Sequence, residues 1–282
     1  MLPDNPTSID DLNDRFIWRI PKQFNIGHAC SNAPAAIMPT KPAILDYSGD
    51  ATVTISFAAL AERSTRFAAA LAGLGIKRGD RVAIMLPQCH EAVVAHLGTY
   101  KLGAIVVPLA MQFGPEALIH RLSVAGASVF VGDALSTGRL AEVRANLPSL
   151  KHIIAIDKSV PQNRQFEELL LNASSDFPTA ATTPDDSAMM LFTSGTTGQP
   201  KGALHGHRVL LGHLPGIQMA QGFMPQDGDI FWTPSDWAWA GGLLNALLPA
   251  LYFGVTIVAA RAPKFEPEWA IDLIKKAGVR NV

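Results

Sequence analysis

The chain of 282 residues is 48% hydrophobic and carries 23 basic and 24 acidic residues, for a formal net charge of −1. This composition is typical of a folded protein with a sizeable core and excludes an intrinsically disordered chain. Without a long run of one charge sign, the sequence offers neither a nucleic-acid footprint nor a polybasic membrane patch, so we expect small-molecule chemistry.

The two cysteines and the N-terminus indicate a compartment. Cys30 and Cys89 lie far apart and lack metal-ligand spacing, which argues against a secreted disulfide scaffold and for a reducing environment. The first 14 residues are polar and acidic, unlike a signal peptide. These features together predict a cytoplasmic protein.

The first part of the chain predicts an irregular cap followed by a hairpin. Short helices are expected over residues 10–18 and 25–33, and the strands of the hairpin over residues 42–47 and 51–57. Ser56 is placed to cap the helix that follows, which should end near residue 74.

Strands and helices then alternate. Nearly all-apolar strands are expected over residues 81–88, 104–109, 128–133 and 152–157, with helices between them over residues 90–102, 115–126 and 136–146. This alternation predicts an α/β fold in which a parallel sheet is covered by helices on both faces.

Residues 157–187 lose this periodicity and have the composition of a surface connection. We therefore expect a subdomain boundary there. The prediction is a first α/β subdomain with its N-terminal cap over residues 1–180, and the start of a second α/β subdomain over residues 181–282.

The strand expected over residues 188–192 leads into the most informative stretch, LFTSGTTGQPKG, at residues 191–202. Gly195 and Gly198 can take positive φ angles that turn backbone N–H groups toward one point, and Lys201 adds a mobile positive charge. Hydroxyl groups that can reach phosphate oxygens or a phosphate-bound Mg²⁺ come from Thr193, Ser194, Thr196 and Thr197. The stretch is suited to holding phosphate.

Two other structures are compatible with a loop of this composition. A Gly/Ser/Thr/Pro cluster of unspecified order is usually a solvated turn. A P-loop needs G-x-x-x-x-G-K-[ST] leading into a helix, but here Gly198 is three residues from Lys201, and Gly202 follows the lysine. The ordinary P-loop is therefore a poor fit.

The stretch closely resembles the phosphate-loop signature of the AMP-forming acyl-CoA synthetases, within the adenylate-forming superfamily. The segments TVTISFAAL, GIKRGDRVAIMLPQ and YKLGAIVVPLA also resemble, in order and spacing, segments found upstream of that loop. The resemblance covers most of the chain. It implies the large N-terminal domain of these enzymes, incomplete, with parallel sheets flanked by helices.

The resemblance also implies roles for the loop residues. Thr196 and Lys201 would be catalytic, and Thr197 would contact Mg²⁺. Contacts to the ATP phosphates are implied for Thr193, Ser194, Gly195, Thr196, Thr197, Gly198 and Lys201.

Two further places bear on the substrate. His205 and His207 form H-x-H without a Cys or carboxylate to complete a metal site, so none is assigned. By resemblance, His207 lies near the acyl-adenylate pocket or orders the loop.

The segment FWTPSDWAWAGG, residues 231–242, resembles the one that lines the acid pocket. Trp239 is expected either to form a wall of that pocket or to lie in the core, and Gly241 leaves room beside the pocket. For Trp237, a place in the core is favoured over a place in the pocket wall.

From Trp237 to Ala260 no residue is charged, and such a run is long enough to span a bilayer. Pro249 and Gly254 interrupt it, and the β-branched segment Val255-Thr256-Ile257-Val258 suggests a helix followed by a buried strand. We therefore expect no membrane span.

The function implied by the resemblance is acid–CoA ligation. A small carboxylic acid reacts with ATP and Mg²⁺ to give acyl-AMP and pyrophosphate, and CoA then takes the acyl group, as in fatty acid metabolism. The chain stops at the entry to another strand, and the family's ribose-binding and lysine-bearing segments are not found in it. We expect a fragment that is inactive alone, its C-terminal half possible in trans. The alternative is a non-catalytic nucleotide-binding or assembly module.

Overall fold

The computed structural model describes residues 2–3, 7–49, 51–160, 162–193, 198–261 and 265–282. Its strands are β1 (Pro42–Asp46), β2 (Val53–Ser56), β3 (Arg81–Met85), β4 (Ile105–Pro108), β5 (Val129–Gly132), β6 (His152–Ala155), β7 (Arg164–Gln165), β8 (Ser187–Thr193), β9 (Lys201–Gly206), β10 (Ile230–Phe231) and β11 (Thr256–Ala259). Its helical segments are α1 (Ile9–Arg15), η1 (His28–Asn32), α2 (Ala33–Ile37), α3 (Phe57–Gly73), α4 (His90–Leu102), α5 (Pro115–Ala125), α6 (Ala134–Val143), η2 (Arg144–Asn146), α7 (Phe166–Asn172), α8 (Arg208–Ala220), α9 (Ala240–Gly242), η3 (Leu243–Leu247), α10 (Leu248–Tyr252) and α11 (Pro267–Ala277).

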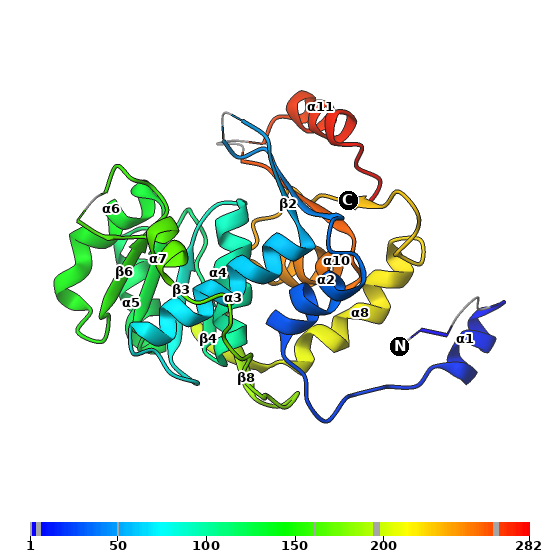
Figure 1. Ribbon diagram of the computed structural model, residues 1–282, viewed down its shortest axis with the longest axis horizontal. Coiled ribbons are helices and arrows are strands. Elements are labelled where there is room, and N and C mark those ends of the chain that lie inside the picture. The colour runs from blue at the N-terminus through cyan, green and yellow to red at the C-terminus, as the bar shows by residue number, and fades with distance from the viewer. Residues whose placement is uncertain (1, 4–6, 50, 161, 194–197, 262–264) are drawn as a thin grey trace.

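The larger sheet has seven strands in the order β7-β6-β5-β3-β4-β8-β9 (Figure 1). All of its pairs are parallel except β8 with β9, which form an antiparallel hairpin at one edge. Every residue of β4 and β5 is buried, as the all-apolar strands predict for a sheet covered on both faces. The α/β class with parallel sheets flanked by helices is confirmed.

The smaller sheet has four strands in the order β10-β11-β1-β2. β1 and β2 are the expected hairpin, and β11 joins β1 in parallel. Strands from both sides of residue 180 thus share each sheet: β1 and β2 lie with β10 and β11, and β8 and β9 with the earlier strands. The division at residue 180 stays a prediction.

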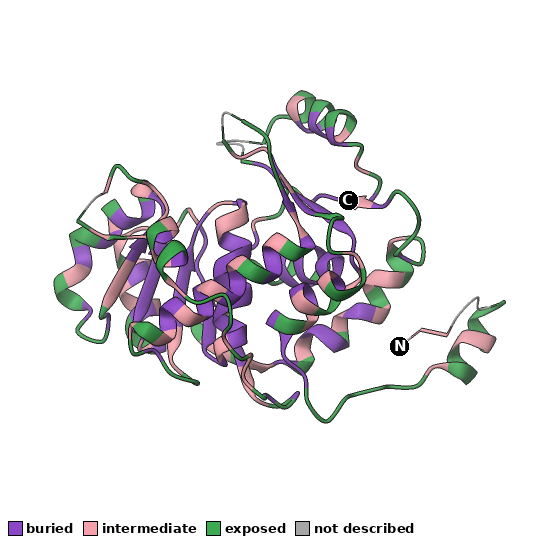
Figure 2. Cartoon of the chain, viewed as in Figure 1, coloured by how far each residue is buried: buried purple, intermediate pink, exposed green. Residues whose placement is uncertain are grey.

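Three hydrophobic clusters arrange the sheets and helices in layers. The main one takes Val82 and Ile84 from β3, Ile257 from β11, and the facing sides of α3 and α4, so these helices lie between the two sheets. The second takes Ala83 and Met85 from the other face of β3 with α5 and α6, and the third packs α11 on the smaller sheet. Figure 2 shows the buried residues concentrated in this interior.

Local signals fix several helix starts. The Ser56 side chain accepts a hydrogen bond from the Ala59 backbone N–H, as expected for the cap of α3. Ser8 caps α1 in the same way, but α1 buries none of its residues and stands away from the body on an extended segment (Figure 1).

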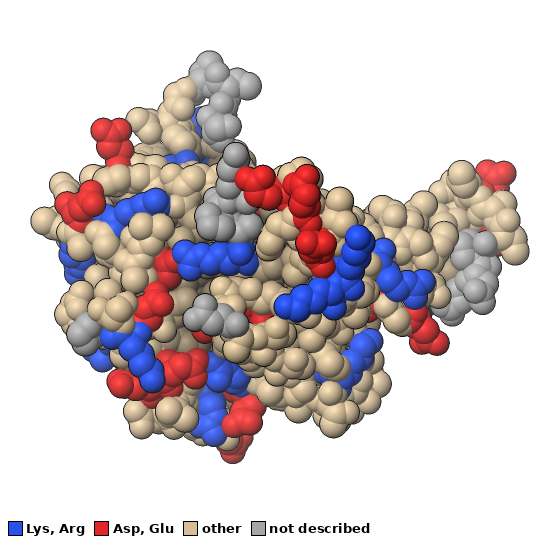
Figure 3. Space-filling view, turned by 90° about the horizontal axis from the view of Figure 1, so that it is seen from above, with Lys and Arg blue, Asp and Glu red and all other residues tan. Residues whose placement is uncertain are grey.

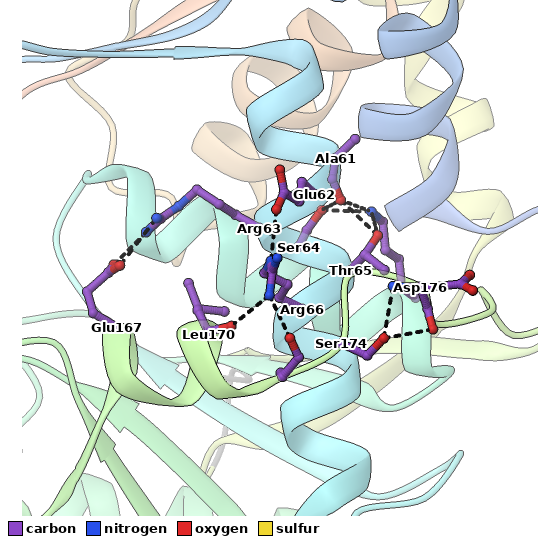
Figure 4. Close-up of polar contacts among 12 residues, drawn as sticks. Ala61, Glu62, Arg63, Ser64, Thr65, Arg66, Glu167, Leu170, Ser174 and Asp176 are labelled. Atoms are coloured by element: carbon purple, nitrogen blue, oxygen red, sulfur yellow. Dashed lines mark hydrogen bonds and ion pairs between the residues drawn. The ribbon is translucent and has the colours of Figure 1, made fainter.

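The connection expected over residues 157–187 contains regular structure, which corrects that prediction. α7 packs on α3, with the Phe67 and Phe166 rings stacked at 5.0 Å between centroids. Arg63 pairs with Glu167, and the Arg66 guanidinium donates to the Leu170 and Ala173 carbonyls (Figure 4). A helix of seven residues is too short for its apolar period to stand out in a polar segment.

The uncharged run from Trp237 to Ala260 folds as the helical segments α9, η3 and α10 followed by β11. Among the described residues, no helix has both the length and the apolarity to cross a membrane. Charges of both signs are interspersed on the face seen in Figure 3, in line with the near-zero net charge.

Candidate active site

The predicted phosphate loop joins the two strands of the β8–β9 hairpin. Thr193 and Lys201 pair across its mouth, so the hydroxyl and the cation flank the loop from opposite strands. Gly198 has φ of 100°, the positive φ expected of it. Ser194, Gly195, Thr196 and Thr197 lie outside the described residues, so their assigned roles stay predictions.

The hairpin lies where an open α/β sheet usually binds ligands. β8 runs parallel to β4, which is parallel to β3, so all three end at the same edge of the sheet. Lys201 is exposed there, and it takes part in none of the ion pairs between described residues. An exposed cation that has no acidic partner among the described residues, three positions after a positive-φ glycine, fits an anionic ligand.

A cavity of about 260 Å³ opens between the carboxyl ends of strands from both sheets. The lining residues that follow β3, β4, β10 and β11 are Pro87, Gln88, Met111, Gln112, Trp232, Thr233, Pro234, Asp236, Ala260 and Arg261. Phe265 and Trp269 complete the lining. We call this cavity the crevice.

Gln88 ties the two sheets together beside the crevice. Its Nε2 donates to the Thr233 and Ser235 carbonyl oxygens at 2.9 and 2.8 Å, which holds the segment after β10 against the end of β3. Asp236 lies in that segment. Burial raises the pKa of its carboxyl group and outweighs hydrogen bonds from the Ala238 and Met111 backbone, which lower it. Sequence reasoning missed Gln88, although its place just after an apolar parallel strand was a usable signal.

His207 is fully buried at the start of α8. Its Nδ1 accepts a hydrogen bond from the Ile26 backbone N–H at 3.1 Å, and the Tyr100 ring lies edge-on at 6.1 Å between centroids. Burial lowers the pKa of His207 to about 4, so the ring is neutral at pH 7 and Nε2 carries its proton. Its assignment to the substrate stays a prediction, as does the alternative of ordering the loop.

Trp237 and Trp239 differ in their burial. Trp237 is in the main core, whereas Trp239 is 52% exposed just before α9. Neither Trp239 nor Gly241 lines the crevice, and their assignment to substrate binding stays a prediction. The close backbone approach occurs at Gly242, where an added Cβ would collide with the Asp236 carbonyl.

Asp46, His90 and Glu91 form the one group of possible metal ligands found among the described residues. His90 Nδ1 lies 2.7 Å from Asp46 Oδ2, and Nε2 lies 3.3 Å from Glu91 Oε1. Both ring nitrogens therefore already have carboxylate partners, and the cluster links the end of β1 to the start of α4. The described part of the chain gives His205 and His207 no place in such a group.

The model of the AMP-binding enzyme family matches residues 32–281. The chain belongs to this family. An acetyl-coenzyme A synthetase of Syntrophus aciditrophicus is 29% identical over 280 residues, which cover 92% of this chain and 43% of that protein. The human mitochondrial acyl-coenzyme A synthetase ACSM2B is 32% identical over 214 residues, covering 75% of this chain and 37% of that protein.

Solved structures agree with this membership. The Brucella canis acyl-CoA synthetase superposes with a TM-score of 0.85 at 29% identity, covering 97% of this chain and 51% of that one. The N-terminal domain of FACL13 from Mycobacterium tuberculosis superposes at 0.78 and 28% identity, covering 90% and 61%. The resemblance to acyl-CoA synthetases is confirmed, and the chain spans about half or less of the length of the curated relatives named here.

Proposed function

We propose that this chain supplies the phosphate-binding and acid-binding parts of an AMP-forming acid–CoA ligase. The observation that carries the proposal is the placement of the signature loop at the sheet edge where strands from both sheets end around one crevice. We propose, as parts of the same function, the whole ligation reaction, a place in fatty acid metabolism and a cytoplasmic location.

In the proposed first step, an oxygen of the substrate carboxylate attacks the α-phosphorus of ATP. An acyl–AMP anhydride bond forms, and the bond to pyrophosphate breaks. Lys201, the Thr193 hydroxyl and the backbone N–H groups beside Gly198 stabilise the charge that grows on the phosphate oxygens. Removal of one such donor costs about 3 kcal/mol in comparable sites.

Ser194, Gly195, Thr196 and Thr197 would complete this cradle, with Thr196 joining Lys201 in catalysis and Thr197 reaching Mg²⁺. When bound, Mg²⁺ neutralises charge on the phosphates. In the second step the CoA thiol attacks the acyl carbonyl, a thioester forms, and AMP leaves.

The crevice is the proposed binding place of the acid. Its walls combine apolar surface from Met111, Trp232 and Phe265 with the polar groups of Gln88 and Asp236. Its volume of about 260 Å³ favours a small carboxylic acid. Trp239 and Gly241 do not line the crevice, and we propose that they contact the part of the acyl group that extends beyond it. We also propose that His207 supports the pocket from the core.

A second candidate function is a nucleotide-binding or assembly module without turnover. One observation favours it: this chain covers 43% of the Syntrophus relative and 51% of the Brucella one. Such a module would bind nucleotide or a partner without carrying out the ligation, or with the remaining parts of the site supplied in trans.

Acid-dependent ATP–pyrophosphate exchange separates the two functions. We would assay the chain joined to the C-terminal half of the Brucella canis enzyme, with Lys201→Ala as the test variant and Lys151→Ala, an exposed lysine before β6, as its control. Ligase function predicts exchange that Lys201→Ala lowers by about a hundredfold or more, while Lys151→Ala keeps it. Equal exchange in both variants would remove Lys201 from the site, and nucleotide binding without exchange would favour the module.

A further inference from the structure

The mouth of the β8–β9 hairpin is held by α5, a helix to which sequence reasoning gave no chemistry. His120 Nε2 lies 2.7 Å from the Pro200 carbonyl oxygen. Because a carbonyl oxygen only accepts, Nε2 carries a proton and donates it. Pro200 and Lys201 share one peptide plane, so a hydrogen bond that fixes this carbonyl also fixes the backbone N–H of Lys201 and the position of its Cα, from which the side chain extends.

The opposite limb of the hairpin rests on the same turn of α5. Phe192 directly precedes Thr193, and its ring meets the His120 ring edge-on at 6.3 Å between centroids. The Arg121 guanidinium carbon lies 3.9 Å from the Phe113 ring centroid and 5.8 Å from that of Phe192, within the range of cation–π attraction. Two neighbouring residues of one helix therefore contact both ends of the phosphate loop.

We infer that His120 is a positioning residue of the phosphate loop, acting through the Pro200 carbonyl on Lys201. The inference rests on the proposed function, which assigns phosphate binding to this loop. A hairpin mouth that is already ordered spares the ligand the cost of ordering it. The net worth of one such hydrogen bond corresponds to about a three- to tenfold change in affinity.

The test compares three variants of the 282-residue chain. His120→Leu removes the donor, and His120→Gln retains an N–H near the position of Nε2. His213→Leu is the matched control, because His213 Nδ1 contacts Asn245 Oδ1 at the same distance of 2.7 Å between α8 and η3. Calorimetry gives the dissociation constants for MgATP and for tripolyphosphate. Amide hydrogen exchange of β9 peptides reports the order of the hairpin without any ligand, and thermal unfolding verifies the fold.

His120→Leu should weaken both ligands about three- to tenfold and speed exchange in β9. His120→Gln should restore both properties to within about twofold, and His213→Leu should change neither. Wild-type affinity and exchange in His120→Leu would overturn the inference, and so would a His120→Gln variant as impaired as His120→Leu. If His120→Leu exchanges faster in β9 but the wild-type chain binds neither ligand, the exchange result would support the positioning of the hairpin. The lack of binding would contradict the proposed function.

Discussion

Lys101 is a lysine inside the main core, 1% exposed on α4. Its ammonium group donates to the Ala61 carbonyl and to the hydroxyls of Ser64 and Thr65, at 2.8 to 3.0 Å, and these acceptors on α3 are labelled in Figure 4. Ion pairs between described residues do not include it. Burial without a counter-ion lowers its pKa to about 7.

This residue should make stability depend on pH. The unfolded chain holds the Lys101 proton up to about pH 10.5. Between pH 7 and 10 the unfolded state thus binds more protons, and the free energy of unfolding rises with pH by roughly 3 kcal/mol from this group. We expect Lys101→Met to abolish this rise in urea unfolding at pH 7 and pH 10. Lys77→Met, at an exposed lysine, should retain it, and an unchanged slope in Lys101→Met would refute the assignment.

At the scale of elements, one carboxylate connects the smaller sheet to the helix layer. Asp46 Oδ2, at the end of β1, accepts from the His90 backbone N–H and lies against His90 Nδ1, both at 2.7 Å. It therefore caps the N-terminus of α4, where a negative charge is favoured. Although burial opposes both charges, hydrogen bonds lower the pKa of Asp46 and, with Glu91, raise the pKa of His90.

The signs of these two shifts define a pH window. A lowered Asp46 pKa stabilises the fold above about pH 3.8, and a raised His90 pKa stabilises it below about pH 6.5. We expect Asp46→Asn to cost about 1 to 3 kcal/mol, most strongly between these values. Chemical unfolding across pH 4 to 8 measures it. Asp133→Asn, which removes the negative charge of a local cap of α6, should lack the change near pH 6.5, and a pH-independent loss in Asp46→Asn would contradict the link.

At the scale of the molecule, the smaller sheet has an added bridge beside β10. Asn281 pairs in parallel with Phe231, and the Trp232 backbone N–H donates to the Asn281 carbonyl at 3.0 Å. The backbone N–H groups of Arg280 and Asn281 donate to the Ile230 carbonyl. Residues 280–281 thus add one isolated bridge outside β10. An open sheet edge favours pairing with another chain.

We expect the 282-residue chain alone to make no acyl-CoA, because it covers 43% of the Syntrophus relative and 51% of the Brucella one. Self-association through the open edge is expected as well. Size-exclusion chromatography and an assay of AMP release that needs ATP, acid and CoA check both. A monodisperse monomer with robust turnover would show that the chain supports the whole reaction.

Much of the local structure followed from the sequence. The alternation of apolar strands with helices predicted the parallel sheet, and the helix expected over residues 90–102 matches α4 to the residue. The order of residues 191–202 indicated both the family and the loop at the end of β8. These features depend on periodicity, capping and turn chemistry, which act over a few residues and are therefore written in short stretches of sequence.

The tertiary structure alone decided which distant segments meet. Strand β11 pairs with β1, and the Thr256 hydroxyl donates to the Pro42 carbonyl across 214 positions of sequence. The burial of Lys101 and His207, and the contact of His120 with the phosphate loop, likewise depend on helices packing against partners far along the chain. No local pattern carries this information, because such contacts become favourable only when the whole core has assembled.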